Sequence, residues 1–583
     1  MLWLLWQLLE RRDRLRFGVS LFFIFIGTIL EMLSLALVIP VVGVILGDKR
    51  QSYDWLPDSI EDMRYQTFTV LLLSLLVLAF LMKNLFMIAS GYYQTRSQLS
   101  LGNRTTQRLF ETYMSQPYEF HLTHSSAVLL RNISEYAGAV QFFLGPALIL
   151  LSDILTGIGF LTILLIVQPG STLLVGFVFG GASWLVLRVT RRRVRAWGEE
   201  RVKYRASINE ALIAGFGGVK EIKLFGRDDQ VLNSHRNSVY AVSRTVYLFN
   251  VIQSLPRALF EVLAVVSVAL AIIVSKLGNQ NSDDATLIIA LFGVVAFRML
   301  PSMNRIVLAL QQMSLTRAGL TGAVDDLALG RGTREDSSRG LPETFNRLEI
   351  SNLKYRYPNV AEHVIDIEQL RIDKSEAIGV VGTSGSGKST FVDLIIGILQ
   401  PESGDITVNG KTIYGSRRQW QDQIGYVPQH VYLMNTTIRR NVAFGLPEKH
   451  IDNGQVERAL RQANLLDFVQ SLPQGWETEV GERGVRLSGG QRQRLGIARA
   501  LYGSPQVIVL DEATSALDEF SEREIVESFR EIAKDHTLIV VAHRTSTLRY
   551  CSRLIRLEGG RIVQEGSFEE VIGSMKGLTN RGQ

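Results

Sequence analysis

The chain has 583 residues, a net charge of +6 and a hydrophobic fraction of 46%, and a chain of this length is expected to fold into at least two domains. The basic residues form no single stripe, so no nucleic-acid partner is expected. The single cysteine, Cys551, excludes an intrachain disulfide and a cysteine metal site.

The first sixteen residues, 1–16, are predicted to form a short helix that lies in the membrane interface. Trp3, Trp6 and several leucines precede the charged stretch from Glu10 to Arg16, and an amphipathic segment of this kind binds the surface of a bilayer. The apolar residues come before the basic ones, which is the reverse of the order in a secretory signal peptide. We therefore expect no cleaved leader.

Residues 17–315 are predicted to form a helical transmembrane domain with long cytoplasmic extensions. Crossing a bilayer takes about 20 apolar residues. Six segments meet this requirement, near 17–46, 67–92, 138–167, 171–190, 248–275 and 285–312. Basic clusters precede the first span and follow the fourth, so the positive-inside rule predicts that both termini are cytoplasmic.

The connections between the predicted spans differ in length. The cytoplasmic connections 93–137 and 191–247 contain few helix breakers, so we expect the helices to continue beyond the membrane. Breaks are predicted at Gln116–Leu122 and Ala214–Gly218, where proline or glycine occurs. The outer segment 47–66 is predicted to be a small amphipathic helix.

Charged residues inside the spans are costly in a bilayer and are functional candidates. They are Glu31, Lys83, Asp153, Arg257, Glu261, Arg298 and Arg305. Arg257 and Glu261 are four residues apart, which fits an ion pair within one helix. Arg298 and Arg305 lie on one helix face and fit structural ion pairs with Glu31, Asp153 or Glu261.

The alternative to structural ion pairs is a cationic lining that contacts an anionic substrate. The candidate substrate residues are Lys83, Arg257, Arg298 and Arg305. A planar guanidinium binds two phosphate oxygens at once, so arginines in a transmembrane domain suit a phosphorylated substrate. Both hypotheses stay open at this point.

After the transmembrane domain the chain becomes polar and rich in glycine over 316–345, which is typical of a linker. Residues 346–583 then alternate between strand-like and helix-like patterns, which predicts an α/β P-loop domain fused to the membrane domain. The predicted elements are strands at Leu348–Leu353, Ala377–Val381 and Val507–Leu510, and a helix at Thr390–Leu399.

One stretch of this domain fits the phosphate-binding pattern G-x-x-x-x-G-K-[ST]. It comprises Gly382, Thr383, Ser384, Gly385, Ser386, Gly387, Lys388, Ser389 and Thr390. Backbone N–H groups of such a loop surround phosphates while the lysine neutralises them. The stretch follows a predicted strand and precedes a predicted helix, and this context makes the pattern a nucleotide site.

Two acidic residues at the end of the buried strand complete the predicted chemistry. Ser389 and Asp511 are expected to bind Mg²⁺ through a hydroxyl and a carboxylate. Glu512 is the best candidate to orient and activate the attacking water. The sequence therefore predicts hydrolysis of a nucleoside triphosphate.

Three further residues are weaker candidates when each is taken alone, because a single histidine or tyrosine usually packs in a core. Tyr357 could stack on adenine. Gln429 could reach the metal, and Gln429 and His543 could reach the γ-phosphate or the water. Their order along the chain strengthens all three hypotheses.

The order of these motifs resembles the nucleotide-binding domain of an ATP-binding cassette (ABC) transporter over about 346–570. The matching positions are Tyr357, Gly382–Thr390, Gln429, Leu487–Gln491, Asp511, Glu512, Ser515–Asp518 and His543. Six spans before one such domain resemble a half-transporter of the exporter type. One departure is Lys374-Ser-Glu376, where the family usually has a glycine, and we expect no functional cost from it.

This resemblance implies ATP and Mg²⁺ as cofactors and a homodimer as the assembly. In the family, each ATP lies between the phosphate loop of one subunit and a signature segment of the other. The signature segment here is Leu487, Ser488, Gly489, Gly490 and Gln491. The positive end of the helix dipole at Gly489 and Gly490 would face the γ-phosphate.

Three stretches of the membrane half, Glu31–Pro40, Leu255–Glu261 and Arg298–Arg305, resemble bacterial flippases for lipid-linked oligosaccharides of the protein-glycosylation type. The resemblance implies a polyprenyl-pyrophosphate substrate, membrane lipids as surroundings and an inner-membrane location. An exporter of drugs or other lipids is the alternative, and it would favour an apolar cavity. A third hypothesis, a cassette ATPase that drives no transport, is disfavoured by the intact Glu512 and Leu487–Gln491.

Overall fold

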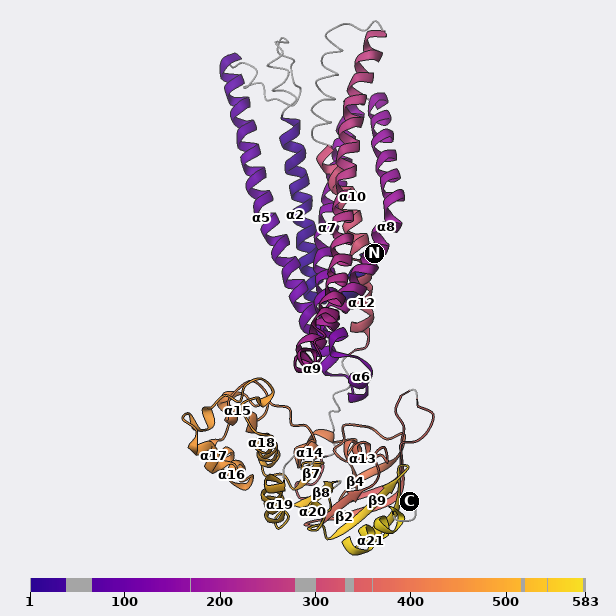
Figure 1. Cartoon of the computed structure of the whole chain (residues 1–583). Coiled ribbons are helices and arrows are strands. Elements are labelled where there is room, and N and C mark those ends of the chain that lie inside the picture. The colour runs from indigo at the N-terminus through magenta and orange to yellow at the C-terminus, as the bar shows by residue number, and fades with distance from the viewer. Residues whose placement is uncertain are drawn as a thin grey trace. The chain divides into compact units, whose positions relative to one another are not determined.

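The computed structural model describes residues 2–37, 65–167, 169–277, 300–330, 340–358, 360–514, 519–542 and 544–579. The chain divides into two compact units (Figure 1). The first comprises Met1–Gln116 and His124–Gly332, and the second comprises Pro117–Thr123 and Thr333–Gln583. The outer segment 47–66, almost entirely, and the residues Arg298 and His543 lie outside the described residues.

The first unit is helical. Its elements are α1 (Leu2–Leu8), α2 (Arg11–Ala36), α5 (Tyr65–Met114), α7 (Ser126–Val167), α8 (Pro169–Gly217), α9 (Val219–Phe225), α10 (Asp228–Leu277), a helix over 300–315, and α12 (Arg317–Ala328). Helix α5 has 50 residues, which is about 75 Å at 1.5 Å per residue. Because the apolar core of a bilayer is only about 30 Å thick, such helices continue well beyond it, as predicted.

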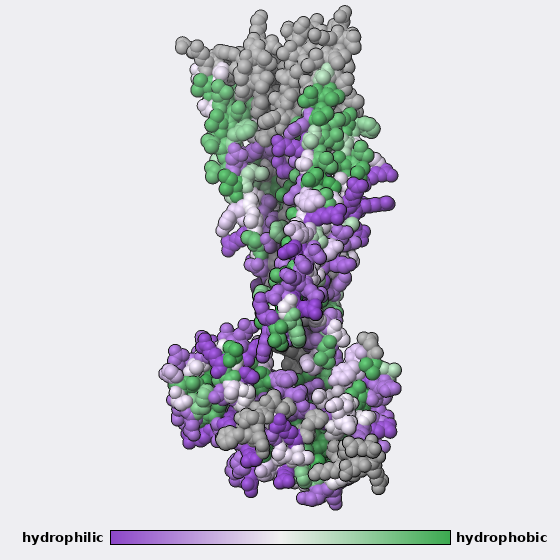
Figure 2. Space-filling view, viewed as in Figure 1, coloured by the Kyte–Doolittle hydropathy of each residue, from purple (hydrophilic) through white to green (hydrophobic). Residues whose placement is uncertain are grey.

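Four of the described helices are long and apolar enough to cross a membrane, within Arg11–Ser34, Thr69–Met114, Ser126–Gly159 and Asp228–Val266. The predicted span at 171–190 is helical within α8. The predicted span at 285–312 lies partly outside the described residues. Figure 2 shows hydrophobic side chains gathered on the surface of this unit. The exposed apolar residues of α5 include Leu78 and Leu85.

The predicted breaks are confirmed at both places. Helix α5 ends at Met114, before Pro117 and the short α6 (Tyr118–Thr123), and α8 ends at Gly217. The N-terminal helix α1 is shorter than predicted, because residues 11–16 already belong to α2. Arg14 of α2 contacts the end of α1. Its guanidinium carbon lies 4.7 Å from the centre of the Trp6 ring, and its Nε donates to the Leu9 carbonyl.

The second unit contains two β-sheets. One is antiparallel, in the order β2-β1-β4-β5, and the other has the order β10-β9-β3-β8-β7-β6, in which all pairs except β10–β9 are parallel. The strands are β1 (Arg347–Tyr355), β2 (Ile365–Asp373), β3 (Ala377–Val381), β4 (Ser403–Val408), β5 (Lys411–Thr412), β6 (Ile424–Val427), β7 (Val507–Asp511), β8 (Thr537–Val541), β9 (Arg553–Glu558) and β10 (Arg561–Gly566). The three predicted strands are therefore present.

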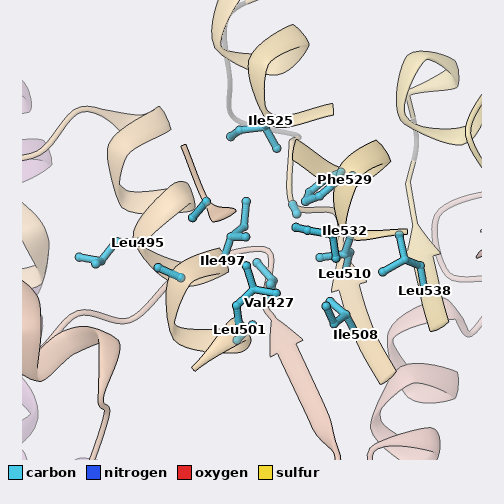
Figure 3. Packing of buried hydrophobic residues seen from close by; sticks show 14 of the residues in the cluster. Val427, Leu495, Ile497, Leu501, Ile508, Leu510, Ile525, Phe529, Ile532 and Leu538 are labelled. Carbon is cyan, nitrogen blue, oxygen red and sulfur yellow. The ribbon is translucent and has the colours of Figure 1, made fainter. Parts of the chain in front are cut away.

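Helices cover the larger sheet, and apolar side chains from both fill the space between them (Figure 3). The α-helices from residue 388 onward are α13 (Lys388–Ile395), α14 (Arg417–Gln421), α15 (Ile438–Val442), α16 (Asn453–Gln462), α17 (Leu466–Ser471), α18 (Gly489–Leu501), α19 (Glu519–Ile532), α20 (Thr545–Leu548) and α21 (Phe568–Thr579). Of these, α13, α14, α18 and α21 contact strands of the larger sheet, whereas α15 and α16 pack against α18. Helix α13 begins and ends earlier than the predicted Thr390–Leu399. Gly397 follows it with φ of +71°, a left-handed conformation that ends a helix.

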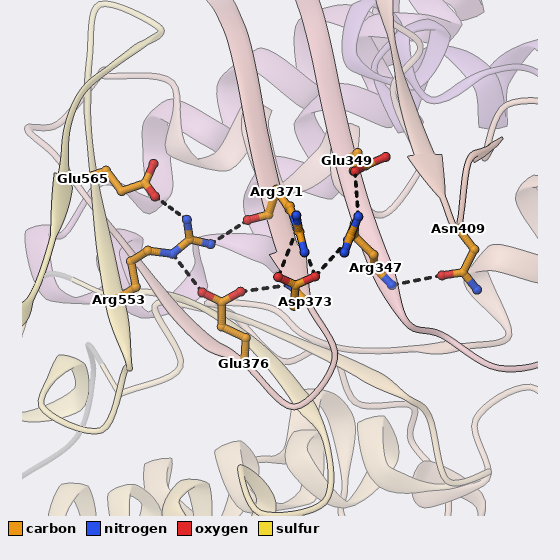
Figure 4. Close-up of polar contacts among 8 residues, drawn as sticks. All are labelled: Arg347, Glu349, Arg371, Asp373, Glu376, Asn409, Arg553 and Glu565. Carbon is orange, nitrogen blue, oxygen red and sulfur yellow. Dashed lines mark hydrogen bonds and ion pairs between the residues drawn. The ribbon is translucent and has the colours of Figure 1, made fainter.

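The turn Lys374–Glu376, where the ABC family usually has glycine, is stabilised by side chains (Figure 4). Ser375 has a left-handed φ of +59°, and its N–H donates to the Thr537 hydroxyl at 2.8 Å. The Glu376 carboxylate accepts from the Asp373 N–H at 2.9 Å and from Arg553 Nε at 2.8 Å. These contacts join the turn to β8 and β9 and offset the strain of a non-glycine residue.

Candidate nucleotide site and charged membrane cluster

The phosphate loop runs from the buried strand β3 into α13, as the sequence predicts. Two of its glycines are required by the backbone. A Cβ at Gly382 would lie 2.3 Å from the Leu557 carbonyl oxygen, and Gly387 has φ of +100°. The loop tip at 383–385 is exposed, so its N–H groups are accessible to a ligand.

Two polar groups inside the loop fit a phosphate ligand. Lys388 is 6% exposed, and its ammonium donates to the carbonyls of Gly382 and Thr383 at 2.9 Å each. Burial lowers the pKa of Lys388. The Ser386 hydroxyl is buried and has no hydrogen-bond partner among the residues that the structure describes. A buried cation beside an unsatisfied hydroxyl is a favourable place for an anion.

The two acidic residues lie next to this loop. Asp511 ends β7 and is 9% exposed. Burial and then the charge of Glu512 raise the pKa of Asp511, while a hydrogen bond from Tyr426 and the charge of Lys388 oppose the rise. Glu512 has a left-handed φ of +47°, and its Oε2 accepts from Gln429 Nε2 at 2.7 Å. Such a backbone conformation is costly for a non-glycine residue and is typical of functional sites, and here it places the Glu512 carboxylate beside the phosphate loop.

Tyr357 also lies against the phosphate loop. Its hydroxyl is 3.0 Å from the Thr390 hydroxyl. The rings of Tyr355 and Tyr357 meet edge to face at 5.2 Å. The structure therefore brings Tyr357, Gln429, Asp511 and Glu512 to the loop.

The signature segment does not join this group within one chain. Ser488 caps α18: its hydroxyl accepts from the Gln491 N–H at 3.2 Å, and its N–H donates to the Gln491 side chain at 2.9 Å. Gly489 and Gly490 form the first turn of α18. Figure 1 shows α18 apart from α13, the helix that follows the phosphate loop. The N-terminus of α18 therefore does not face the phosphate loop of its own chain.

Asp393 and Tyr426 complete the site, and the sequence analysis missed Asp393. It lies on α13, and burial, followed by the charge of Asp511, raises its pKa to about 6. Its place a turn and a half after Lys388 on the same helix was the available signal. Asp393 is a carboxylate that folding makes harder to ionise.

Replacing Asp393 by Asn is expected to flatten the pH dependence of stability. The folded pKa of about 6 exceeds the unfolded value of about 4, so the folded state binds this proton more tightly. Its contribution to stability is complete below about pH 4 and is lost as the pH rises through 6. Thermal unfolding of the nucleotide-free full chain at several pH values between 4 and 8 measures this.

The exposed Asp467→Asn is the matched control for that experiment and should follow the wild type. Above pH 6, Asp393→Asn should unfold at a higher temperature than the wild type, because the variant carries no buried charge. Parallel pH profiles for wild type and Asp393→Asn would contradict the prediction.

Two family models match the chain: the ABC transporter model over residues 366–515 and the ABC transporter transmembrane region over residues 17–299. The ATP-dependent lipid A-core flippase of Cupriavidus metallidurans is 32% identical over 506 residues, which cover 86% of this chain and 84% of the relative. That of Burkholderia pseudomallei is 33% identical over 504 residues, with coverage of 83% and 81%. The chain is an ABC exporter half-transporter.

A solved bacterial Atm1-family ABC exporter with ATP bound has the same fold, with a TM-score of 0.76 over 96% of both chains and 21% identity. The family model and the curated relatives show that the cassette of this half-transporter binds ATP and is an ATPase coupled to transport. The predicted half-transporter, a helical membrane domain fused to an α/β cassette, is confirmed. The count of six transmembrane helices and the glycosylation-type substrate stay predictions, and the curated relatives are named for lipid A-core.

The predicted substrate cations of the half-transporter are paired wherever the structure describes them. Arg257 Nε donates to Glu261 Oε1 at 2.9 Å, four residues along α10, and its side chain is 75% exposed. This is the intrahelical ion pair that the spacing predicts. An exposed pair of this kind stabilises a helix only slightly, so Arg257 stays accessible to another anion.

The other cations pair between helices. Lys83 of α5 lies 3.3 Å from Glu31 of α2, and its side chain is only 7% exposed. Arg305 Nε lies 2.9 Å from Asp153 Oδ2, and Arg305 Nη2 lies 2.6 Å from Asp153 Oδ1. Asp153 belongs to α7, so the structural pairing that the sequence analysis left open is present for Arg305.

Proposed function

We propose that the half-transporter works as a homodimer that uses ATP to flip a polyprenyl-pyrophosphate-linked oligosaccharide across the bacterial inner membrane. Both termini and both cassettes are cytoplasmic in this proposal. The observation that carries this proposal is the exposure of Arg305: its side chain is 51% exposed although it forms an ion pair with Asp153. An exposed guanidinium in a membrane domain is costly beside lipid and suits a cavity that receives a phosphate.

A second candidate substrate is lipid A-core itself. The names of the curated relatives, at 32% and 33% identity, favour it. Export of drugs or of other lipids is the remaining alternative, and it gives the exposed cations Arg257 and Arg305 no role. All three candidates use the same ATPase, so only the transported molecule distinguishes them.

The residues of the cassette fit ATP. Lys388 and the N–H groups of 382–390 would hold the phosphates, and Tyr357 would lie against adenine. The unsatisfied Ser386 hydroxyl supports this assignment. The polar groups that the loop leaves without partners are those that phosphate oxygens satisfy.

Mg²⁺ is the second proposed cofactor, with Ser389, Gln429 and Asp511 as its contacts. When bound, it neutralises phosphate charge. The buried Asp511, whose pKa burial raises, gains from a cation beside it. Glu512 would orient and activate the water, held by its hydrogen bond to Gln429, and His543 would contact the γ-phosphate.

The test is ATP-dependent flipping in proteoliposomes, with a defined lipid-linked oligosaccharide, lipid A-core, a phospholipid and a drug measured side by side. We expect the oligosaccharide to be flipped fastest. Arg257→Ala should slow that flipping about tenfold and leave basal ATPase unchanged, while Arg530→Ala in the cassette changes neither. Faster transport of the drug or the phospholipid would overturn the proposal, and preference for lipid A-core would select the second candidate.

The proposed homodimer predicts that each ATP needs both subunits. A mixed dimer with Lys388→Ala in one chain and Ser488→Arg in the other places both changes at one ATP and leaves the second site intact. A dimer with both changes in one chain spoils both sites. Purified mixed dimers of the first kind should therefore retain more ATP hydrolysis than the second kind, and equal activity of the two would exclude head-to-tail pairing.

A further inference from the structure

Four charged residues from four helices form one cluster in the membrane domain. Glu31 of α2 pairs with Lys83 of α5, and Asp153 of α7 pairs with Arg305 of the helix over 300–315. Helices α2, α5 and α7 pack against one another, and Glu31 also lies close enough to Arg305 to favour its charge. Among the residues that the structure describes, the two cations and the two carboxylates of these pairs balance in charge.

The pair of Arg305 and Asp153 is unequal in exposure. The Asp153 side chain is 6% exposed, whereas that of Arg305 is 51% exposed. Arg305 uses its Nε and Nη2 groups for Asp153, and Nη2 also donates to the Ser302 hydroxyl at 3.0 Å. Among the described residues, none accepts a hydrogen bond from Nη1. Asp153 and Ser302 therefore bind one side of the guanidinium, while about half of the Arg305 side chain is exposed.

A carboxylate bound in this way competes with any phosphate for the same cation. A singly charged headgroup that displaces Asp153 exchanges one anionic acceptor for another and leaves a buried carboxylate without its partner, which is costly. A pyrophosphate has a second anionic group, which a further cation can bind. The free energy of this additional interaction exceeds the free energy lost when Asp153 is displaced from Arg305.

We infer that Asp153 is an internal competitor for Arg305 that keeps singly charged phospholipid headgroups out of the substrate site. Asp153 is thus a specificity-determining residue, and it acts through Arg305 instead of touching the substrate. This inference rests on the proposed function, because it assigns the Arg305 site to a pyrophosphate lipid. Bacterial membranes present many singly charged phosphate headgroups to such a site, so this competition decides which lipid occupies it.

The experiment measures lipid binding to the full-length protein in nanodiscs of zwitterionic lipid. The probes are a short-chain phosphatidylglycerol and a short-chain polyprenyl pyrophosphate, with excess ADP to keep both lipids off the phosphate loop. Asp153→Asn should bind phosphatidylglycerol at least tenfold more tightly than the wild type. Its affinity for the polyprenyl pyrophosphate should change less than threefold, so selectivity falls.

Three further variants control this experiment. Glu199→Gln removes an exposed carboxylate from the Arg195 pair, which belongs to no proposed site, and should leave the selectivity unchanged. Asp153→Asn combined with Arg305→Gln removes both charges and should lose the gained affinity. Asp153→Gln is a second neutral replacement, to be used if Asp153→Asn does not fold, as judged by thermal unfolding.

Unchanged phosphatidylglycerol affinity in folded Asp153→Asn or Asp153→Gln would overturn the inference, as would an equal gain for both lipids. Failure of the proposed function has a different signature. If the wild type binds no polyprenyl pyrophosphate, the proposed substrate is wrong. A gain in phosphatidylglycerol binding by Asp153→Asn would still establish Asp153 as the competitor for Arg305.

Discussion

Replacing Glu512 by Gln is expected to reduce ATP hydrolysis by the full-length half-transporter at least about a hundredfold, while ATP binding is retained. Removing a general base typically costs a factor of about 10²–10⁴. Glutamine has the shape of glutamate, so the left-handed backbone at position 512 and the contact with Gln429 at 2.7 Å can persist. Only the carboxylate that would accept a proton from water is lost.

The measurement is phosphate release by purified protein, together with binding of a fluorescent ATP analogue. Glu531→Gln is the matched control, since Glu531 is exposed and pairs with Lys534 on the surface of the cassette. Near-normal hydrolysis by the Glu512→Gln protein would remove Glu512 from the proposed role. A loss of ATP binding would instead show that the substitution disturbs the loop.

Lys388→Ala is expected to weaken ATP binding itself, by about tenfold to a hundredfold. The ammonium is buried, 2.9 Å from each of two loop carbonyls, and burial lowers the pKa of Lys388. A phosphate therefore gains a cation that is already desolvated. A hydrogen bond to a charged group contributes about 1.5–3 kcal/mol, and about 1.4 kcal/mol corresponds to a factor of ten.

The binding of the same fluorescent analogue to the full-length protein measures this effect. Lys534→Ala, an exposed lysine of the cassette, is the control and should bind ATP normally. The two variants should thus have different defects. Glu512→Gln binds ATP without hydrolysing it, whereas Lys388→Ala binds ATP poorly. Equal affinities for wild type and Lys388→Ala would exclude Lys388 from phosphate binding.

The elements of the cassette that the sequence predicted correctly are those with a local cause. Strands β3 and β7 are apolar at nearly every position because both faces of a central strand are buried. The phosphate loop follows directly from its glycines, which the backbone requires at Gly382 and Gly387. The length of α5 beyond the membrane likewise follows from the scarcity of helix breakers, since Tyr65–Met114 contains no proline.

Other features depend on neighbours that are distant in the sequence, and the sequence analysis missed them or left them open. Asp393 looks like an ordinary helix residue, and only its burial near Asp511 raises its pKa to about 6. Ser375 is accepted in a left-handed turn because Thr537 and Glu376 stabilise that turn. None of these partners can be read from the local pattern.

The sequence by itself determined the ATPase chemistry, the division into membrane and cassette halves, and the presence of charges inside the helices. The tertiary structure decided which of those charges neutralise one another. Lys83 and Glu31 are 52 residues apart, and Arg305 and Asp153 are 152 apart. Such pairs depend on how each helix is rotated and shifted against its neighbours. Packing of whole helix faces sets that arrangement, because no local propensity specifies it.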